Sequence, residues 1–174
     1  MPLDTLIAKC QEPKETNRQI GPMFKNWVKN SNTFINIKKS NMDIDILHSD
    51  STILHIGNDN DLYNFAKNHL GYTRDKGIDF IVKVVNKNTK NHKYIVGEAK
   101  FLTDFGGHQN AQLEDALATA KSNFNDNVIP IVILDGVCYI KNNSKMYKRI
   151  TNEPDLNIMS ALFLYSFILY QEGL

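Results

Sequence analysis

The chain has 174 residues, which is enough for one domain with a substantial hydrophobic core. A hydrophobic content of 42% and a charged content of 22% are ordinary for a globular protein, and the net charge of +1 excludes a global basic field, so a nucleic-acid partner would need a local basic patch. Its two cysteines, Cys10 and Cys138, lie far apart and exclude a disulfide scaffold and a thiolate metal site, so we expect a cytoplasmic location.

The N-terminal third is expected to contain helices and short strands. Leu3–Cys10 has the pattern of a short helix and no long apolar stretch, so it does not look like a secretion signal. Lys14–Asn30 shows helical spacing of apolar residues, and Gly21-Pro22 marks a kink or a break in that helix. Short strands are predicted at Phe34–Ile37, Asp43–Leu47 and Thr52–Ile56.

The middle of the chain shows a clearer pattern. Asp59–Leu70 is predicted to be a helix, and Gly71 is a natural C-terminal stop for it. Ile78–Val85 and Lys93–Phe101 are predicted strands, and the polar stretch between them predicts that they form a hairpin.

The C-terminal part is expected to complete a mixed sheet flanked by helices. A helix is predicted from about His108 to Phe124. Val128–Leu134 is fully apolar, which indicates a strand buried on both sides, and a tight turn leads from it into a second strand, Val137–Lys141. Pro154 is expected to open a final helix, Asp155–Gln171, whose apolar part is too short to cross a membrane.

The triplet Glu98-Ala99-Lys100 is the most informative feature of the sequence. Alternate residues of a strand share a face, so Glu98 and Lys100 point one way and Ala99 the other. A carboxylate and an ammonium within a buried strand are costly unless they pair or bind a metal. Asp79, at the start of the preceding strand, brings a second carboxylate to the same place. The simpler interpretation is a buried ion pair beside a strand-end aspartate, because E-x-K is a short and common pattern.

Two carboxylates and a lysine on adjacent strands suit metal-assisted cleavage of a phosphodiester. Oxygen ligands of this kind hold Mg²⁺, the expected cofactor, which usually keeps several waters. The metal neutralises the phosphate and lowers the pKa of a bound water. A nearby lysine positions that water or stabilises the charge that develops on the phosphate.

The order of the elements and these residues resemble the PD-(D/E)xK nuclease superfamily. The similarity is most specific over residues 71–116, where Gly77-Ile78-Asp79-Phe80-Ile81 and the block from Gly97 to Gln112 look like a block found in a group of type II restriction endonucleases. A weaker similarity covers Glu15–Val28. The resemblance implies an α/β (α+β-like) fold with a mixed central sheet and a restriction-endonuclease-like αβββαβ core. In one nuclease domain, residues 1–58 would be a helical or irregular extension and residues 59–174 the catalytic core and C-terminal helix.

The resemblance also implies roles for individual residues. Asp79 and Glu98 would be metal ligands, the backbone carbonyl of Ala99 would complete the metal shell, and Lys100 would be the catalytic lysine. Ile78 stands where the superfamily motif has a proline in many members, which is a small departure.

Glu15 and Gln112 are further candidates for the active site. Some members of the superfamily supply an extra carboxylate from a helix ahead of the core, which would be Glu15; the alternative is a solvated glutamate favoured by the helix dipole. Gln112 is expected to steer Lys100 or a metal-bound water, and the alternative is an exposed polar residue.

Candidate contacts to DNA lie at a helix start and just ahead of Asp79. The first residues of a helix present N–H groups and amides that hold anions. Basic residues next to the catalytic group are suited to phosphate contacts, which fix position rather than sequence. The DNA-binding candidates are Arg74, Lys76, His108, Gln109 and Asn110.

The sequence therefore predicts an Mg²⁺-dependent endonuclease acting on double-stranded DNA, in particular a type II restriction enzyme. One active site cuts one strand, so a homodimer or a heterodimer with another restriction subunit is expected, with the apolar stretch Leu156–Leu169 as an interface or as core. A structure-specific repair or recombination nuclease and a non-cleaving DNA-binding subunit are the alternatives. The chain is short for this resemblance, which leaves open a compact enzyme, one subunit, or a form without recognition elements.

Overall fold

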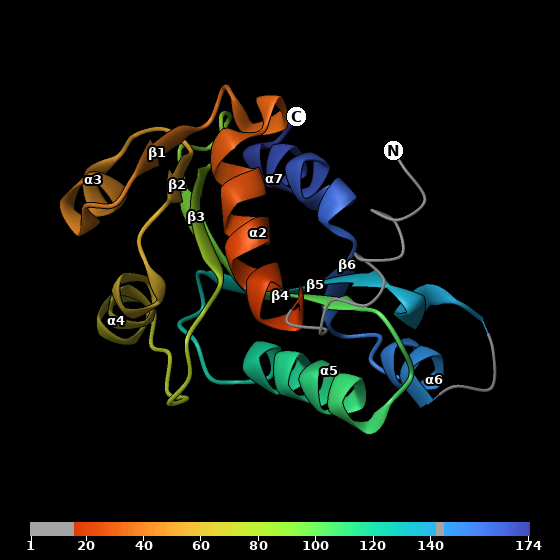
Figure 1. The fold of residues 1–174 in the computed structure, drawn as a ribbon. Helices are drawn as coiled ribbons and strands as arrows, with labels where there is room; N and C mark the ends of the chain where they lie inside the picture. The colour runs from red at the N-terminus through yellow and green to blue at the C-terminus, as the bar shows by residue number, and fades with distance from the viewer. Residues whose placement is uncertain (1–15, 142–144) are drawn as a thin grey trace, which may run out of the picture.

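A six-stranded mixed sheet forms the centre of the molecule (Figure 1). The computed structural model describes residues 16–141 and 145–174, with residues 16–22 described by their backbone alone. The strands lie side by side in chain order; β3 is antiparallel to both of its neighbours, and the remaining neighbours run parallel. They are β1 (Lys38–Ser40), β2 (Ile53–His55), β3 (Phe80–Val85), β4 (His92–Leu102), β5 (Val128–Gly136) and β6 (Asn157–Met159).

Helices cover both faces of this sheet (Figure 1). The α-helices are α2 (Thr16–Asn30), α3 (Asp43–His48), α4 (Asp59–His69), α5 (Gly107–Ala120), α6 (Lys145–Thr151) and α7 (Leu164–Glu172). Three short 3-10 helices join them: η1 (Asn32–Phe34), η2 (Val137–Tyr139) and η3 (Ala161–Phe163). The expected α/β architecture is confirmed. None of the described helices is both long and apolar enough to cross a membrane.

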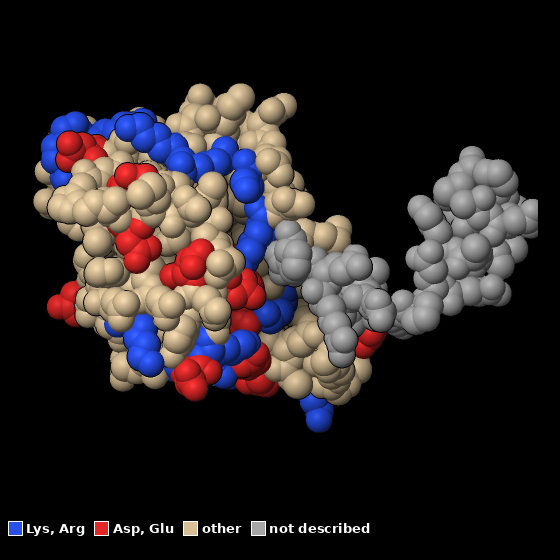
Figure 2. Space-filling model, turned by 60° about the vertical axis from the view of Figure 1, so that its left-hand side comes forward, with Lys and Arg blue, Asp and Glu red and all other residues tan. Residues whose placement is uncertain are grey.

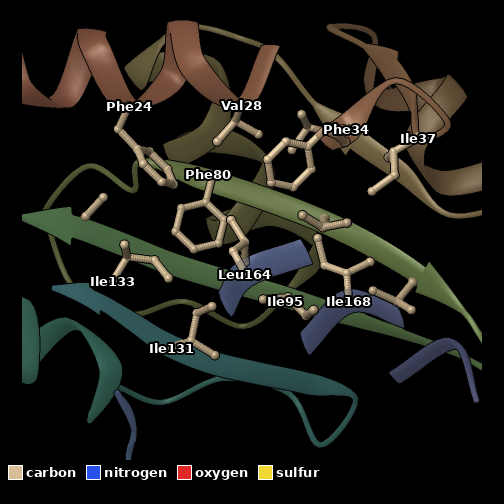
Figure 3. Packing of buried hydrophobic residues seen from close by; sticks show 14 residues of the cluster. Phe24, Val28, Phe34, Ile37, Phe80, Ile95, Ile131, Ile133, Leu164 and Ile168 are labelled. Carbon is tan, nitrogen blue, oxygen red and sulfur yellow. The ribbon is translucent and has the colours of Figure 1, made fainter. Parts of the chain in front are cut away.

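One face of the sheet packs against α2 and α7 through a continuous apolar core (Figure 3). Phe24 and Val28 of α2, and Leu164 and Ile168 of α7, pack onto side chains of the three central strands, all of them buried. The inward-facing residues on those strands include Phe80, Ile95 and Ile131. Burial of apolar area at about 25 cal/mol per Å² makes this layer a large contributor to the folding free energy.

The opposite face carries two separate apolar clusters. One lies under α4 and contains Tyr94 and Val96 of β4. The other lies under α5 and α6 and contains Leu102 of the same strand. Between them, at alternating positions of β4, stand Glu98 and Lys100. Glu98 and Lys100 therefore separate the two clusters of this face in the middle of the sheet.

Several predicted elements are confirmed. Asp59–Leu70, Lys93–Phe101 and Val128–Leu134 correspond to α4, β4 and β5 within two residues at each end. Helix α2 runs without a break through Gly21 and Pro22. The predicted helix Leu3–Cys10 lies outside the described residues.

Two of the short strands predicted near the N-terminus are wrong. The predicted strand Phe34–Ile37 is replaced by the last residue of η1 and a turn at residues 35–37, because Ser31 accepts a hydrogen bond from the N–H of Thr33 and so caps a helical turn. At Asp43–Leu47 it forms α3. The alternation of Asp and Ile suggested a strand, but acidic residues in the first turn favour a helix, and only one buried side chain is needed to hold it.

The C-terminal predictions Val137–Lys141 and Asp155–Gln171 also need correction. Strand β5 already lies between β4 and β6, so no edge is left for a hairpin partner, and residues 137–139 form η2. The predicted final helix is divided: Asn157–Met159 pairs with β5 as β6, Ser160 caps η3, and α7 begins only at Leu164. Helix α6 lies in a stretch for which no element was predicted.

Candidate active site

The β3–β4 hairpin brings the three residues of the predicted triad into one cluster. Asp79 immediately precedes β3, and its N–H donates to the carbonyl of Gly97 at 3.0 Å. The Asp79 carboxylate accepts a hydrogen bond of 2.8 Å from the N–H of Ala99, which fixes it beside β4. The Lys100 Nζ lies 2.6 Å from Glu98 Oε1 and 3.8 Å from Asp79 Oδ2. Glu98 and Lys100 thus share a face, as their spacing predicts.

Gly97 allows the strands around this cluster to approach closely. A Cβ atom at this position would lie 2.6 Å from the carbonyl oxygen of Ile131 on β5 and 2.6 Å from the ring of Phe80 on β3. Both neighbours are buried and part of the sheet. The residue before Glu98 therefore has to lack a side chain for the three central strands to keep this spacing.

A second lysine reaches the same glutamate. Lys76 Nζ donates to Glu98 Oε1 at 2.6 Å and also pairs with the carboxylate of Asp115 on α5. The other carboxylate oxygen of Glu98 accepts a 2.8 Å hydrogen bond from the hydroxyl of Thr119, one turn further along α5. Glu98 is 2% exposed, so these contacts replace nearly all of its hydration.

Arg74 completes a network behind Glu98. Its guanidinium donates to Asp115 Oδ1 and to Thr119 Oγ1, both at 2.7 Å, and to the Asp115 backbone carbonyl at 3.0 Å. The cluster then holds three carboxylates and three cationic side chains in balance: Asp79, Glu98 and Asp115 against Arg74, Lys76 and Lys100. Asp115 and Thr119 were not predicted. Their i, i+4 spacing places them on one face of α5, but nothing in the sequence says that this face meets β4.

Burial and charge shift the pKa values in this cluster in different directions. Burial raises the pKa of Asp79, and Lys100 and the Ala99 N–H offset only part of that effect. Burial also opposes ionisation of Glu98, but Lys100 and Lys76 outweigh it, so the Glu98 pKa is lowered. Burial lowers the pKa of Lys76, against the attraction of Glu98. The surroundings therefore favour ionisation of Glu98 and disfavour ionisation of Asp79, and a cation beside Asp79 would lower its pKa.

The donor set suits a hard divalent cation. Asp79 and Glu98 supply carboxylate oxygens, and Ala99, whose N–H bonds the Asp79 carboxylate, directly follows Glu98 and supplies a backbone carbonyl. Mg²⁺ is commonly held by one or two carboxylates and retains several waters, so this set is sufficient for it. In the described part of the chain no group of three or more His, Cys, Asp or Glu side chains forms a metal cage. Glu15 lies outside the described residues.

The predicted polar residues at the start of α5 make local contacts. Gln109 is buried and donates to the Thr103 hydroxyl at 3.2 Å. Gln112 lies 3.0 Å from the ring of His108, and Asn110 caps the preceding loop through the carbonyls of residues 105 and 106. Among the described residues, no hydrogen bond joins these four side chains to the triad.

A small cavity opens beside Asp79 on the side of α2. It has a volume of about 190 Å³ and is bounded by Lys25 and Lys29 of α2, His55 of β2 and Asp79. Lys25 forms an ion pair with Asp59 at the start of α4. The acidic centre is thus bordered by α5 on one side and by the basic side chains of α2 on the other.

Comparison with known proteins gives one family. The family described as "Tsp45I type II restriction enzyme" matches residues 1–170 of the 174 residues. No curated protein and no solved structure gives a significant match.

Proposed function

The chain belongs to the Tsp45I type II restriction enzyme family, and from this premise we propose that it is a Mg²⁺-dependent endonuclease that cleaves double-stranded DNA at a specific sequence. Membership makes it a restriction endonuclease; the metal, the duplex substrate and the residues that act on it are the proposal. The observation that carries it is the cluster of Asp79, Glu98 and Lys100 in the middle of the sheet, between two apolar clusters.

The residues of the cluster have separate roles in the proposed hydrolysis. Asp79, Glu98 and the Ala99 carbonyl would hold Mg²⁺, which when bound lowers the pKa of a water ligand and neutralises the phosphate. Lys100 directs its ammonium group at the same point, where it stabilises the negative charge that builds up on the phosphate oxygens. The surrounding strands keep these groups at fixed positions, so little reorganisation is needed during the reaction.

Basic side chains beside the cluster support DNA as the substrate. Figure 2 shows Lys and Arg side chains gathered in an arc that ends near a group of acidic side chains. Lys29 on α2 and Lys38 on β1 are exposed, and neither makes an ion pair among the described residues. Unpaired lysines of this kind neutralise backbone phosphates and release counterions. The residues at the start of α5, namely His108, Gln109, Asn110 and Gln112, remain candidates for contacts near the scissile phosphate.

A dimer follows from the chemistry proposed. Cutting both strands needs two active sites, and a twofold dimer supplies them. Leu162 and Phe163 in η3 are 80% and 64% exposed, whereas Leu164 and Ile168 behind them are buried. The predicted stretch Leu156–Leu169 thus contributes core through its second half, and we propose its exposed η3 segment as the dimer contact.

Digestion of DNA of known sequence with purified protein tests this function. With Mg²⁺ we expect discrete fragments, and sequencing of their ends gives the recognition sequence and the stagger. Lys100→Ala is expected to abolish cleavage, and Lys148→Ala on α6 serves as the matched lysine control. Cleavage that survives Lys100→Ala would show that the centre is assigned wrongly. Binding without cleavage by the wild-type protein would favour a non-catalytic subunit.

A further inference from the structure

Two ammonium groups share a single oxygen of Glu98. Lys76 Nζ and Lys100 Nζ each lie 2.6 Å from Oε1. The side chain of Glu98 is 3% exposed, so water does not compete for this oxygen. A dication that takes Glu98 as a ligand has to displace at least one of the lysines or suffer their repulsion, because like charges at this distance in a buried site interact strongly.

The two lysines differ in the second carboxylate with which each can pair. Lys100 has Asp79 nearby, but Asp79 is itself a proposed metal ligand. Lys76 already touches Asp115, which lies on α5 and outside the proposed metal ligands. Asp115 is held in place by two contacts from Arg74, one to its carboxylate and one to its backbone carbonyl. It is therefore a fixed second carboxylate for Lys76.

We propose that Lys76 is an exchangeable counter-ion: it neutralises Glu98 in the metal-free protein and is transferred to Asp115 when a divalent cation binds. Lys76 and Asp115 are then positioning residues that set the metal affinity of the site without ligating the metal. This inference rests on the proposed function, since it takes Asp79 and Glu98 as metal ligands. It also changes the role expected for Lys76, from a phosphate contact to an internal competitor of the metal.

The proposal predicts opposite effects for the two partners. In Lys76→Met the competitor is gone, so the affinity for Mg²⁺ should increase; a charge-assisted hydrogen bond of this type corresponds to roughly tenfold. In Asp115→Asn the lysine has no second carboxylate and stays on Glu98, so the affinity should decrease by a similar factor. In the double variant the Asp115→Asn effect should disappear, because there is no lysine left to transfer.

The experiment measures the midpoint of thermal unfolding against Mg²⁺ concentration for each variant, without DNA, relative to its own metal-free state. Ligand binding to the folded state adds RT ln(1 + [L]/Kd) to the free energy of unfolding, so the Mg²⁺ concentration at which the midpoint begins to rise reports the affinity of each variant. Lys148→Met, which removes an exposed lysine on α6 outside the cluster, is the matched control and should leave the affinity unchanged.

The possible outcomes separate the two proposals. Opposite shifts for the single variants support the exchange. A loss of affinity in both single variants, as expected for groups that only brace the site, would overturn it while leaving the proposed function intact. If wild-type protein shows no response to Mg²⁺ and no Mg²⁺-dependent cleavage, the proposed function itself fails, and the exchange fails with it.

Discussion

The two faces of strand β4 are built on different principles. On the face toward α2 and α7, Ile95 and Ala99 belong to one continuous apolar core. On the face toward α4 and α5, Val96 and Leu102 belong to two separate clusters, with Glu98 and Lys100 between them. The same eleven-residue strand is thus part of an apolar core on one side and a wall of the proposed active site on the other.

The charged residues reduce the stabilising apolar burial on one face of β4 only. Charged groups in the middle of a sheet forgo apolar burial and require partners. The uninterrupted core on the opposite face offsets that loss, and it also holds β4 straight through the site. Changes on the two faces should therefore have separable effects, on activity for one face and on stability for the other.

The largest effect on activity is expected for Asp79→Asn. The variant removes a proposed metal ligand, and cleavage should fall by about 10²–10³-fold, the size typical of losing one electrostatic contributor to catalysis. Stability should stay the same or increase at pH 7: burial raises the Asp79 pKa, so ionised Asp79 disfavours the folded state, and asparagine keeps an acceptor for the Ala99 N–H. Initial rates of plasmid cleavage and urea unfolding together check both parts.

The largest effect on stability is expected for Ile95→Ala, on the other face of the same strand. Ile95 is fully buried, and its truncation should lower the free energy of unfolding by ~2–5 kcal/mol. The specific activity of the folded protein should remain close to wild type. If cleavage fell as far as in Asp79→Asn while the protein remained folded, the two faces would not be independent.

An intermediate effect is expected from two exposed lysines, Lys29 on α2 and Lys38 on the edge strand β1. Each of Lys29→Gln and Lys38→Gln should reduce the slope of log affinity against log salt by about 0.9, the value for one lost phosphate contact on duplex DNA. Lys148→Gln, on the α6 side, should leave it unchanged. The slopes are measured by fluorescence anisotropy without Mg²⁺. Equal slopes in all three variants would mean that DNA does not lie along α2.

The smallest effect is a pH dependence from His55, a buried residue next to α4. The Gly57 N–H donates to its Nδ1 at 3.1 Å, so Nδ1 carries no proton, and burial lowers the His55 pKa below 6.5. As the pH falls through 6.5, His55 binds a proton in the unfolded chain before it does so in the folded protein. Protonation therefore stabilises the unfolded state, and the free energy of unfolding decreases. The stability difference between wild type and His55→Asn should therefore narrow as the pH falls from 8 to 5.5. A constant difference would show that His55 does not titrate in this way.

Local sequence patterns were sufficient for the elements that the site depends on. The alternation in β4, the apolar run of β5 and the capping signals of α4 each determine their own structure. The spacing of Glu98 and Lys100 is a local property of a strand, and their contact followed from it. Register supplied the rest: Phe80 opposite Gly97 puts Asp79 beside Ala99.

The failures arose where a non-local partner decided the outcome. Residues 157–159 form a strand because β5 has a free edge with which they pair. The sequence of these residues does not indicate that this edge is available. Residues 137–139 form η2 outside the sheet because β6 already pairs with that edge of β5. The Glu98 network was missed in the same way. Asp115 and Thr119 reach the network because α5 packs across β4, and the sequence of a helix face does not identify the strand against which it packs.

The order of the strands has a consequence for how the protein is made. Because the six strands lie in the sheet in the order of synthesis, each new strand finds its partner already translated, and no segment has to be inserted between earlier ones. Contacts close in sequence form without a large loop-closure penalty. The acidic centre, however, gains its last support only when Thr119 reaches Glu98. Thr119 precedes β5 and β6 in the chain, so all residues of the acidic centre are synthesised before the last two strands of the sheet.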